Sequence, residues 1–129
     1  MGATRHTGLH HRRAARDSYD LLEWLSKVVR LTEINASVCT GANILAKVGL
    51  LDGRKVTTHW SNLDHLAELV PTAHVQKNVR WVDEGTLVTG AGISAGIDMS
   101  LHVVERLFGR ATAEAVARYM EYNWSENPT

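Results

Sequence analysis

Residues Ser37 to Trp60 read SVCTGANILAKVGLLDGRKVTTHW, and this stretch contains the clearest strand-to-helix pattern of the chain. It opens inside a short apolar run, Ile34 to Val38, whose β-branched ends are typical of a buried strand. The segment from Ala42 to Val48 contains good helix formers and ends at Gly49, where a left-handed helix cap is favoured. Cys39, the only cysteine of the chain, therefore lies where a strand turns into a helix.

The alternation of strands and helices continues on both sides of this stretch. Apolar residues at helical spacing predict a helix that Asp17 or Ser18 caps and that ends near Arg30. Further along, the patterns predict a strand at 55–58, a helix at 62–69, a hairpin of strands 79–82 and 86–89, a helix from 97 that stops at 109, and a last helix that Thr112 caps and that runs to about 122. This order predicts one α/β domain with a largely parallel sheet and helices on both faces.

Composition restricts the partners and the compartment. A chain of 129 residues with 44% apolar residues is long enough for one domain with a core. Fourteen basic and fourteen acidic side chains cancel, so we expect neither a nucleic-acid partner nor a membrane partner. The chain has no apolar run of the length that a membrane span requires. One cysteine cannot form an internal disulfide, which predicts a reducing, cytoplasmic location.

The two ends differ in character from the central part. Residues 1–16 hold four arginines and three histidines with few apolar groups, so we expect a flexible basic arm there and a short tail at 123–129. The domain itself is predicted to span residues 17–122. His6, His10 and His11 have no acidic or cysteine partner close by, so we expect no metal and no cofactor.

The position of Cys39 suggests chemistry. A nucleophile at a strand-to-helix turn projects from the carboxyl edge of the sheet, and the helix N-terminus favours a thiolate there. Gly41 would let the backbone turn tightly with no Cβ in the way. His59, which follows the predicted strand at 55–58, could accept or donate a proton at the same edge. The alternatives are a packed, unreactive thiol and a histidine that only hydrogen-bonds the backbone, and the residues alone leave both open.

The segment from Gly90 to Ala95 formally meets a relaxed dinucleotide-binding fingerprint. The strand and acidic residue that should follow are missing, because residues 101–122 are predicted to be helical. We therefore interpret this glycine-rich segment as a loop that brings backbone and Ser94 to the Cys39 pocket. Asp98 is interpreted as complementing the dipole of the next helix. Three further histidines are interpreted as surface or boundary residues without a clear partner: His65, His74 and His102.

Three motifs together resemble the ThiJ/PfpI family within the class I glutamine amidotransferase-like superfamily. They are VCTGANILAKVGLLDGRKVTTHW, VRWVDEGTLVTGAGISAGIDMSLHVVERLFG and ARYMEY. The resemblance implies a flavodoxin-like, three-layer α/β domain with a mostly parallel sheet, commonly a homodimer. It also implies that Cys39 is the nucleophile of an elbow and that His59 is the family histidine near it.

The residue after the cysteine points to a branch of the family. Thr40 occupies that position, as it does in isonitrile hydratases and in the sensor domains of AraC-type regulators. For the hydratase-like group, the resemblance implies that the thiolate attacks a small isonitrile, that the product is an N-substituted formamide, and that Thr40 positions or protonates the intermediate. We expect the substrate pocket to include four further residues: Gly41, Gly92, Ile93 and Ser94.

One departure from the family pattern concerns the N-terminus. Family members usually begin with additional residues that include the first strands, a glycine-rich turn and an acidic side chain bonded to the cysteine. Residues 17–122 correspond to the C-terminal two thirds of the family domain, so we expect an incomplete domain with reduced or lost activity. The alternatives are a small-molecule or oxidative-stress sensing domain without a DNA-binding region, and a structural remnant with no pocket.

Overall fold

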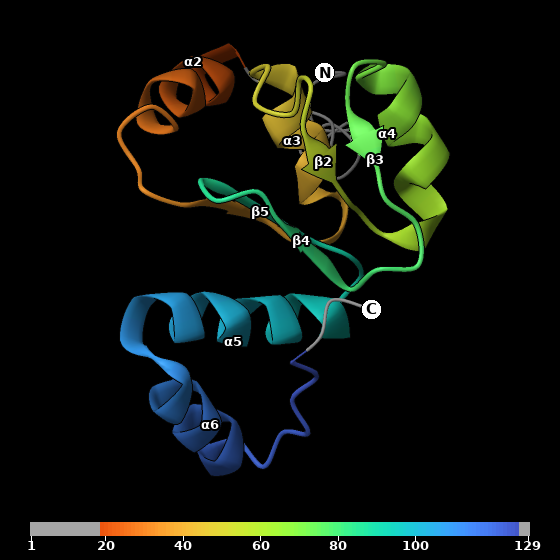
Figure 1. Ribbon diagram of the computed structural model, residues 1–129. Coiled ribbons are helices and arrows are strands. Elements are labelled where there is room, and N and C mark those ends of the chain that lie inside the picture. The colour runs from red at the N-terminus through yellow and green to blue at the C-terminus, as the bar shows by residue number, and fades with distance from the viewer. Residues whose placement is uncertain (1–18, 127–129) are drawn as a thin grey trace, which may run out of the picture.

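The computed structural model describes residues 19–126, and the expected basic arm and helix cap at 17–18 lie outside this range. Helices and strands alternate up to residue 75, after which two consecutive strands and two consecutive helices follow (Figure 1). In order, they are α2 (Tyr19–Val28), β1 (Asn35–Ser37), the 3-10 turn η2 (Cys39–Gly41), α3 (Ala42–Lys47), β2 (Lys55–Val56), η3 (Trp60–Asn62), α4 (Leu63–Leu69), β3 (His74–Val75), β4 (Trp81–Asp83), β5 (Leu87–Gly90), α5 (Ser94–Phe108) and α6 (Arg110–Tyr119).

The main sheet has the strand order β1-β5-β4, and a second, two-stranded sheet pairs β2 with β3. β1 is parallel to β5, with Ala36 opposite Val88, and β2 is parallel to β3. β4 and β5 form the predicted antiparallel hairpin, in which Gly85 has a φ of 86°. The predicted mostly parallel α/β arrangement is confirmed, whereas β3 was not predicted.

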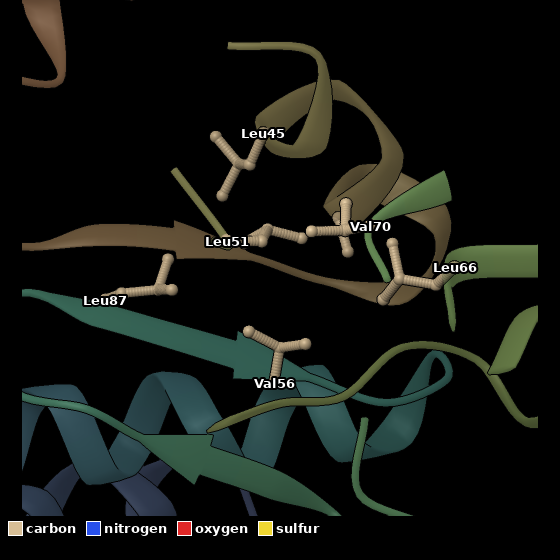
Figure 2. Packing of buried hydrophobic residues seen from close by; sticks show 7 residues of the cluster. Leu45, Leu51, Val56, Leu66, Val70 and Leu87 are labelled. Carbon is tan, nitrogen blue, oxygen red and sulfur yellow. The ribbon is translucent and has the colours of Figure 1, made fainter. Parts of the chain in front are cut away.

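Helices cover both faces of the main sheet, as the sequence predicted. Strand alternation directs Leu87 and Val88 of β5 to opposite faces. Leu87 joins the larger core with residues of α3, β2 and α4, which converge in Figure 2. This core consists of Ala42, Leu45, Leu51, Val56, Leu66, Val70 and Leu87. Val88 packs with Trp81 and Met99 on the other face, where α5 lies under β4 and β5 and α6 packs against α5 (Figure 1).

Two predicted helix starts were wrong. α5 begins at Ser94, so Gly96 lies inside the helix and not in a loop before it. Gly96 is there for close packing, because an added Cβ would lie 2.9 Å from Cγ1 of Val38. α6 begins at Arg110 and ends at Tyr119, and the Thr112 hydroxyl donates back to the carbonyl of Phe108 (3.1 Å) instead of capping the helix.

His102 has clear partners, which corrects the sequence interpretation. Its ring stacks on Trp81 with 3.9 Å between ring centroids, and its Nε2 lies 2.7 Å from Oδ2 of Asp83. Arg106 also contacts Asp83, and the Gly85 N–H donates to the same carboxylate at 2.7 Å. This cluster joins the β4–β5 hairpin to α5.

Asp83 is expected to give the fold an acid-sensitive contribution. Burial alone would raise the pKa of Asp83, but the hydrogen bonds from His102 and Gly85 and the charge of Arg106 lower the pKa below its ordinary value of 3.8. A lowered pKa stabilises the fold above about pH 4, and the stabilisation disappears as the pH falls through the lowered value. Asp83→Asn should therefore cost about 1 kcal/mol at neutral pH and little in acid.

Thermal unfolding between pH 3 and pH 7 measures this difference, since these pH values bracket the ordinary carboxyl pKa of about 4. Asp64→Asn, at an exposed position of α4, is the matched control and should not change the pH dependence. An Asp83→Asn deficit that is equal at all pH values would contradict the prediction.

Candidate functional site

Cys39 occupies a strained turn between β1 and α3. Its φ is 55°, a left-handed value that is uncommon for a residue other than glycine. Gly41, by contrast, has helical angles (φ −57°, ψ −23°), and the nearest atom to an added Cβ would be 3.8 Å away. The expectation that Gly41 makes the turn tight was therefore wrong, because the strained residue is the cysteine itself.

Two hydrogen bonds fix the backbone of Cys39. Its N–H donates to the carbonyl of Ala91 (2.9 Å), which ties the turn to the glycine-rich loop after β5. Its carbonyl accepts from the hydroxyl of Thr58 (2.7 Å), which ties it to the segment after β2. The cysteine is thus held between the two segments that the sequence analysis placed at the same edge.

A buried amide pair supports this arrangement, and the sequence analysis missed it. Asn62 donates to Oδ1 of Asn43 (2.8 Å) and to Oγ1 of Thr58 (3.1 Å). Asn43 lies in α3 and Asn62 lies at the start of α4, so the pair joins the two helices that follow the strands. The sequence did contain a signal for this pair. Asn43 follows Cys39, and Asn62 follows His59, each at the start of a helix.

The Thr58 hydroxyl is expected to set the position of Cys39. Thr58→Val leaves the Cys39 carbonyl and an Asn62 donor without their partner, which should cost about 1–3 kcal/mol and change the alkylation rate of the folded protein. Thr57→Val is the matched control, because Thr57 is equally buried but donates to Gln76, away from the cysteine. Mass spectrometry of the alkylated protein measures both variants. The same alkylation rate in both would contradict a specific role for Thr58.

His59 lies beside the glycine-rich loop. An added Cβ on Gly92 would lie 2.5 Å from Cδ2 and 3.2 Å from Nε2 of the ring, so the imidazole rests directly on that glycine. Nδ1 accepts the backbone N–H of Ser61 (3.1 Å). The Ser61 hydroxyl lies 2.7 Å from the same Nδ1, so Ser61 occupies this nitrogen and Nε2 remains on the side of Gly92.

A shallow hollow of about 330 Å³ opens between His59 and the N-terminus of α5. Three of the predicted pocket residues, Gly92, Ile93 and Ser94, line it together with Trp60 and Arg80, whereas Gly41 does not. Cys39 does not line the hollow. Cys39 is partly exposed, and the buried Ser37 hydroxyl two residues earlier has no hydrogen-bond partner among residues 19–126.

Asp98 has a different role from the one expected. It is 1% exposed, and its carboxylate pairs with Nε of Arg80 at 2.6 Å. Arg80 also donates to the Ser94 hydroxyl (3.2 Å), and the carboxylate accepts the N–H of Ser125 (3.0 Å). Asp98 therefore anchors the rim of the hollow and the C-terminal segment.

The described site brings three of the expected residues together around Ala91, namely Cys39, His59 and Gly92. Thr40 is exposed beside the cysteine, and the roles assigned to Thr40 and to the pocket residues stay predictions. Between residues 19 and 126, no cluster of histidine, cysteine and acidic residues could hold a metal ion, and no helix is long and apolar enough to cross a membrane.

The chain is thus a flavodoxin-like α/β domain with its cysteine at a strand-to-helix elbow. The chain belongs to the DJ-1/PfpI family, whose model matches residues 8–106. A ThiJ/PfpI family protein from Pseudomonas syringae has the same fold, with a TM-score of 0.78 and 34% identity over 90% of this chain and 46% of that one. DJ-1beta of Drosophila melanogaster, at 23% identity, shares the fold with a TM-score of 0.72 and covers 85% of this chain and 58% of its own.

The sequence relatives include an enzyme and several transcriptional regulators. The chain is 44% identical over 87 residues to an isonitrile hydratase of Pseudomonas putida, which covers 67% of this chain and 36% of the hydratase. It is 35% identical over 97 residues to the HTH-type transcriptional regulator CdhR of Pseudomonas aeruginosa, which covers 75% of this chain and 29% of the regulator. The chain thus spans only about a third of the length of these curated relatives.

Proposed function

We propose that the chain carries the nucleophile side of a cysteine-dependent site that hydrates a small isonitrile. The left-handed Cys39 between β1 and α3 carries this proposal, because a strained, partly exposed cysteine at a helix start is suited to act as a nucleophile. The 44% identity to an isonitrile hydratase supports the choice of substrate class.

The reaction balances with water alone. The Cys39 thiolate adds to the terminal carbon of the isonitrile, and that carbon takes a proton, so a thioimidate forms. Water then adds to the same carbon, the carbon–sulfur bond breaks, and the thiolate leaves as the N-substituted formamide forms. No oxidant, reductant or cofactor enters this balance.

His59 would supply a proton in this scheme. Nδ1 faces Ser61, so Nε2, on the side of Gly92 and the hollow, is the nitrogen that would exchange a proton with the substrate. The imidazolium form of His59 would give its Nε2 proton to the isonitrile carbon, and the neutral ring would take back the proton released when water adds and the formamide forms. Thr40, beside the cysteine, would position or protonate the intermediate. The proposal also includes that the protein forms a homodimer and that it acts in the cytoplasm.

The contact between Gly92 and His59 provides a test of the histidine. Gly92→Ala places a Cβ within 2.5 Å of the ring, so the ring must move, and turnover should fall about 100-fold if the acid is displaced. Glu68→Ala is the control, since Glu68 is exposed on α4 and does not line the hollow. Equal turnover in the two variants would contradict a proton-transfer role for His59.

The hydratase proposal is tested by incubating the purified protein with an isonitrile. Infrared absorption measures the loss of the isonitrile, and mass spectrometry measures the formamide that forms. Cyclohexyl isocyanide and benzyl isocyanide are suitable probes. Formamide production that Cys39→Ala removes supports the proposal. If no formamide forms although Cys39 is readily alkylated in the folded protein, the hydratase proposal is contradicted.

A second candidate function is ligand sensing without turnover. The similarity to CdhR and to a second regulator, GbdR of Pseudomonas aeruginosa (33% identity over 91 residues), favours it, as does a hollow that Cys39 does not line. A small molecule that raises the unfolding temperature equally in the parent protein and in Cys39→Ala, without turnover, would favour sensing over hydration.

A further inference from the structure

Two large apolar side chains at the hollow beside His59 are exposed to solvent. Trp60 begins η3 and is 78% exposed, while Ile93 immediately precedes α5 and is 82% exposed. Both side chains line the hollow, which has a volume of about 330 Å³. This volume is at the lower end of the range of small-molecule sites, so the hollow fits a small organic group.

The hollow lies next to the cysteine without including it. Ala91 lines the hollow, and its carbonyl accepts the N–H of Cys39 at 2.9 Å. His59 lines the same hollow and rests on Gly92. A small molecule whose reacting carbon reaches Cys39 can therefore place its other end in the hollow. An isonitrile has this shape, because its reacting carbon is terminal and its substituent extends from the nitrogen.

Two side chains of the hollow favour an aromatic substituent over a saturated one. The indole of Trp60 is tilted by 36° from the His59 ring and is mostly exposed, so a second ring can pack against it. Arg80 presents a planar guanidinium, which also stacks on aromatic rings. That guanidinium is held in place by Asp98 (2.6 Å) and by the Ser94 hydroxyl (3.2 Å). A saturated ring has a similar apolar area but no π face for either group.

The charges around the hollow favour an uncharged substituent. Among the described residues that line it, only Arg80 carries a fixed charge. This cation is already paired with the buried carboxylate of Asp98. A charged substituent would lose hydration in the hollow without gaining an unpaired partner.

We propose that the hollow binds the uncharged aromatic substituent of an isonitrile and that Trp60 is the residue that selects it. The inference rests on the proposed hydratase function for the reacting group, and it adds the class of substituent and the residue that recognises it. The bound ring lies against the indole of Trp60 and contacts Ile93, while the terminal carbon extends past Ala91 toward Cys39.

The experiment measures binding in Cys39→Ala, which cannot form the carbon–sulfur bond. Isothermal titration calorimetry compares N-benzylformamide with N-cyclohexylformamide, the hydration products of benzyl and cyclohexyl isocyanide. The benzyl compound should bind roughly fivefold more tightly, which is the gain expected from one aromatic contact. Adding Trp60→Ala should remove this difference, and adding Trp60→Phe should keep most of it. Trp24→Ala is the matched control, because Trp24 is an exposed tryptophan of α2 that does not line the hollow.

Equal affinities for the two formamides would overturn the proposal, and so would a preference for the benzyl compound that survives in Trp60→Ala. Absence of binding by both compounds would overturn it as well. Isonitrile turnover is measured separately in the parent protein. Selective binding of the benzyl compound without turnover would contradict the hydratase proposal and keep the aromatic site, whereas turnover without selective binding would contradict only the aromatic site.

Discussion

Replacing Cys39 by alanine is expected to lower isonitrile hydration by at least about 1,000-fold, because the carbon–sulfur bond of the intermediate cannot form. The substitution removes one sulfur atom from a partly exposed position and leaves both backbone hydrogen bonds of residue 39 in place. The fold should therefore be retained. The rate of formamide formation, measured beside the unfolding temperature, separates lost chemistry from lost structure.

Ser37→Ala is the matched control for this result. The Ser37 hydroxyl lies two residues earlier on the same strand, is buried, and has no hydrogen-bond partner, so its removal should not affect the rate. If Cys39→Ala still hydrates the isonitrile, another group is the nucleophile and the proposal is wrong. An equal loss in both variants would mean that packing near β1, and not the thiol, limits the rate.

The sequence predicted the position of the strand-to-helix turn at Cys39 but not the left-handed backbone conformation of the cysteine. The apolar run before Cys39 and the helix formers after it fixed the strand-to-helix junction, and both elements are present. Propensity rules assign left-handed backbone to glycine, so they selected Gly41. The structure puts the strain on Cys39 instead, where bonds to Ala91 and Thr58 from distant segments hold it.

Side-chain partners from other elements account for most of the errors. Asp98 and His102 lie on α5, and their partners Arg80 and Asp83 lie 18 and 19 residues away on or before β4. A local pattern contains no signal for such pairs, because they depend on which strand the helix covers. The packing role of Gly96 was missed for the same reason, since Val38 comes from β1.

Removal of Arg80 is expected to cause a large loss of stability. Arg80→Met leaves the Asp98 carboxylate buried without its cation, which should lower the free energy of unfolding by about 3–5 kcal/mol. The N–H of Ser125 still donates to that carboxylate and the Tyr122 hydroxyl lies near it, but neutral donors do not compensate a buried charge. Urea unfolding at neutral pH, followed by tryptophan fluorescence, measures the difference.

Arg80 and Asp98 differ in solvent exposure, so removing either partner should have a different effect on stability. The Arg80 side chain is 35% exposed while that of Asp98 is 2% exposed, so an unpaired Arg80 can be hydrated and an unpaired Asp98 cannot. Asp98→Asn should therefore cost less than Arg80→Met, and adding Asp98→Asn to Arg80→Met should restore part of the stability. Arg106→Met is the control, because Asp83 is more exposed than Asp98 and keeps His102 as a partner. If Arg80→Met costs no more than Arg106→Met, the Asp98 charge is compensated by other groups, and the ion pair does not hold the rim of the hollow.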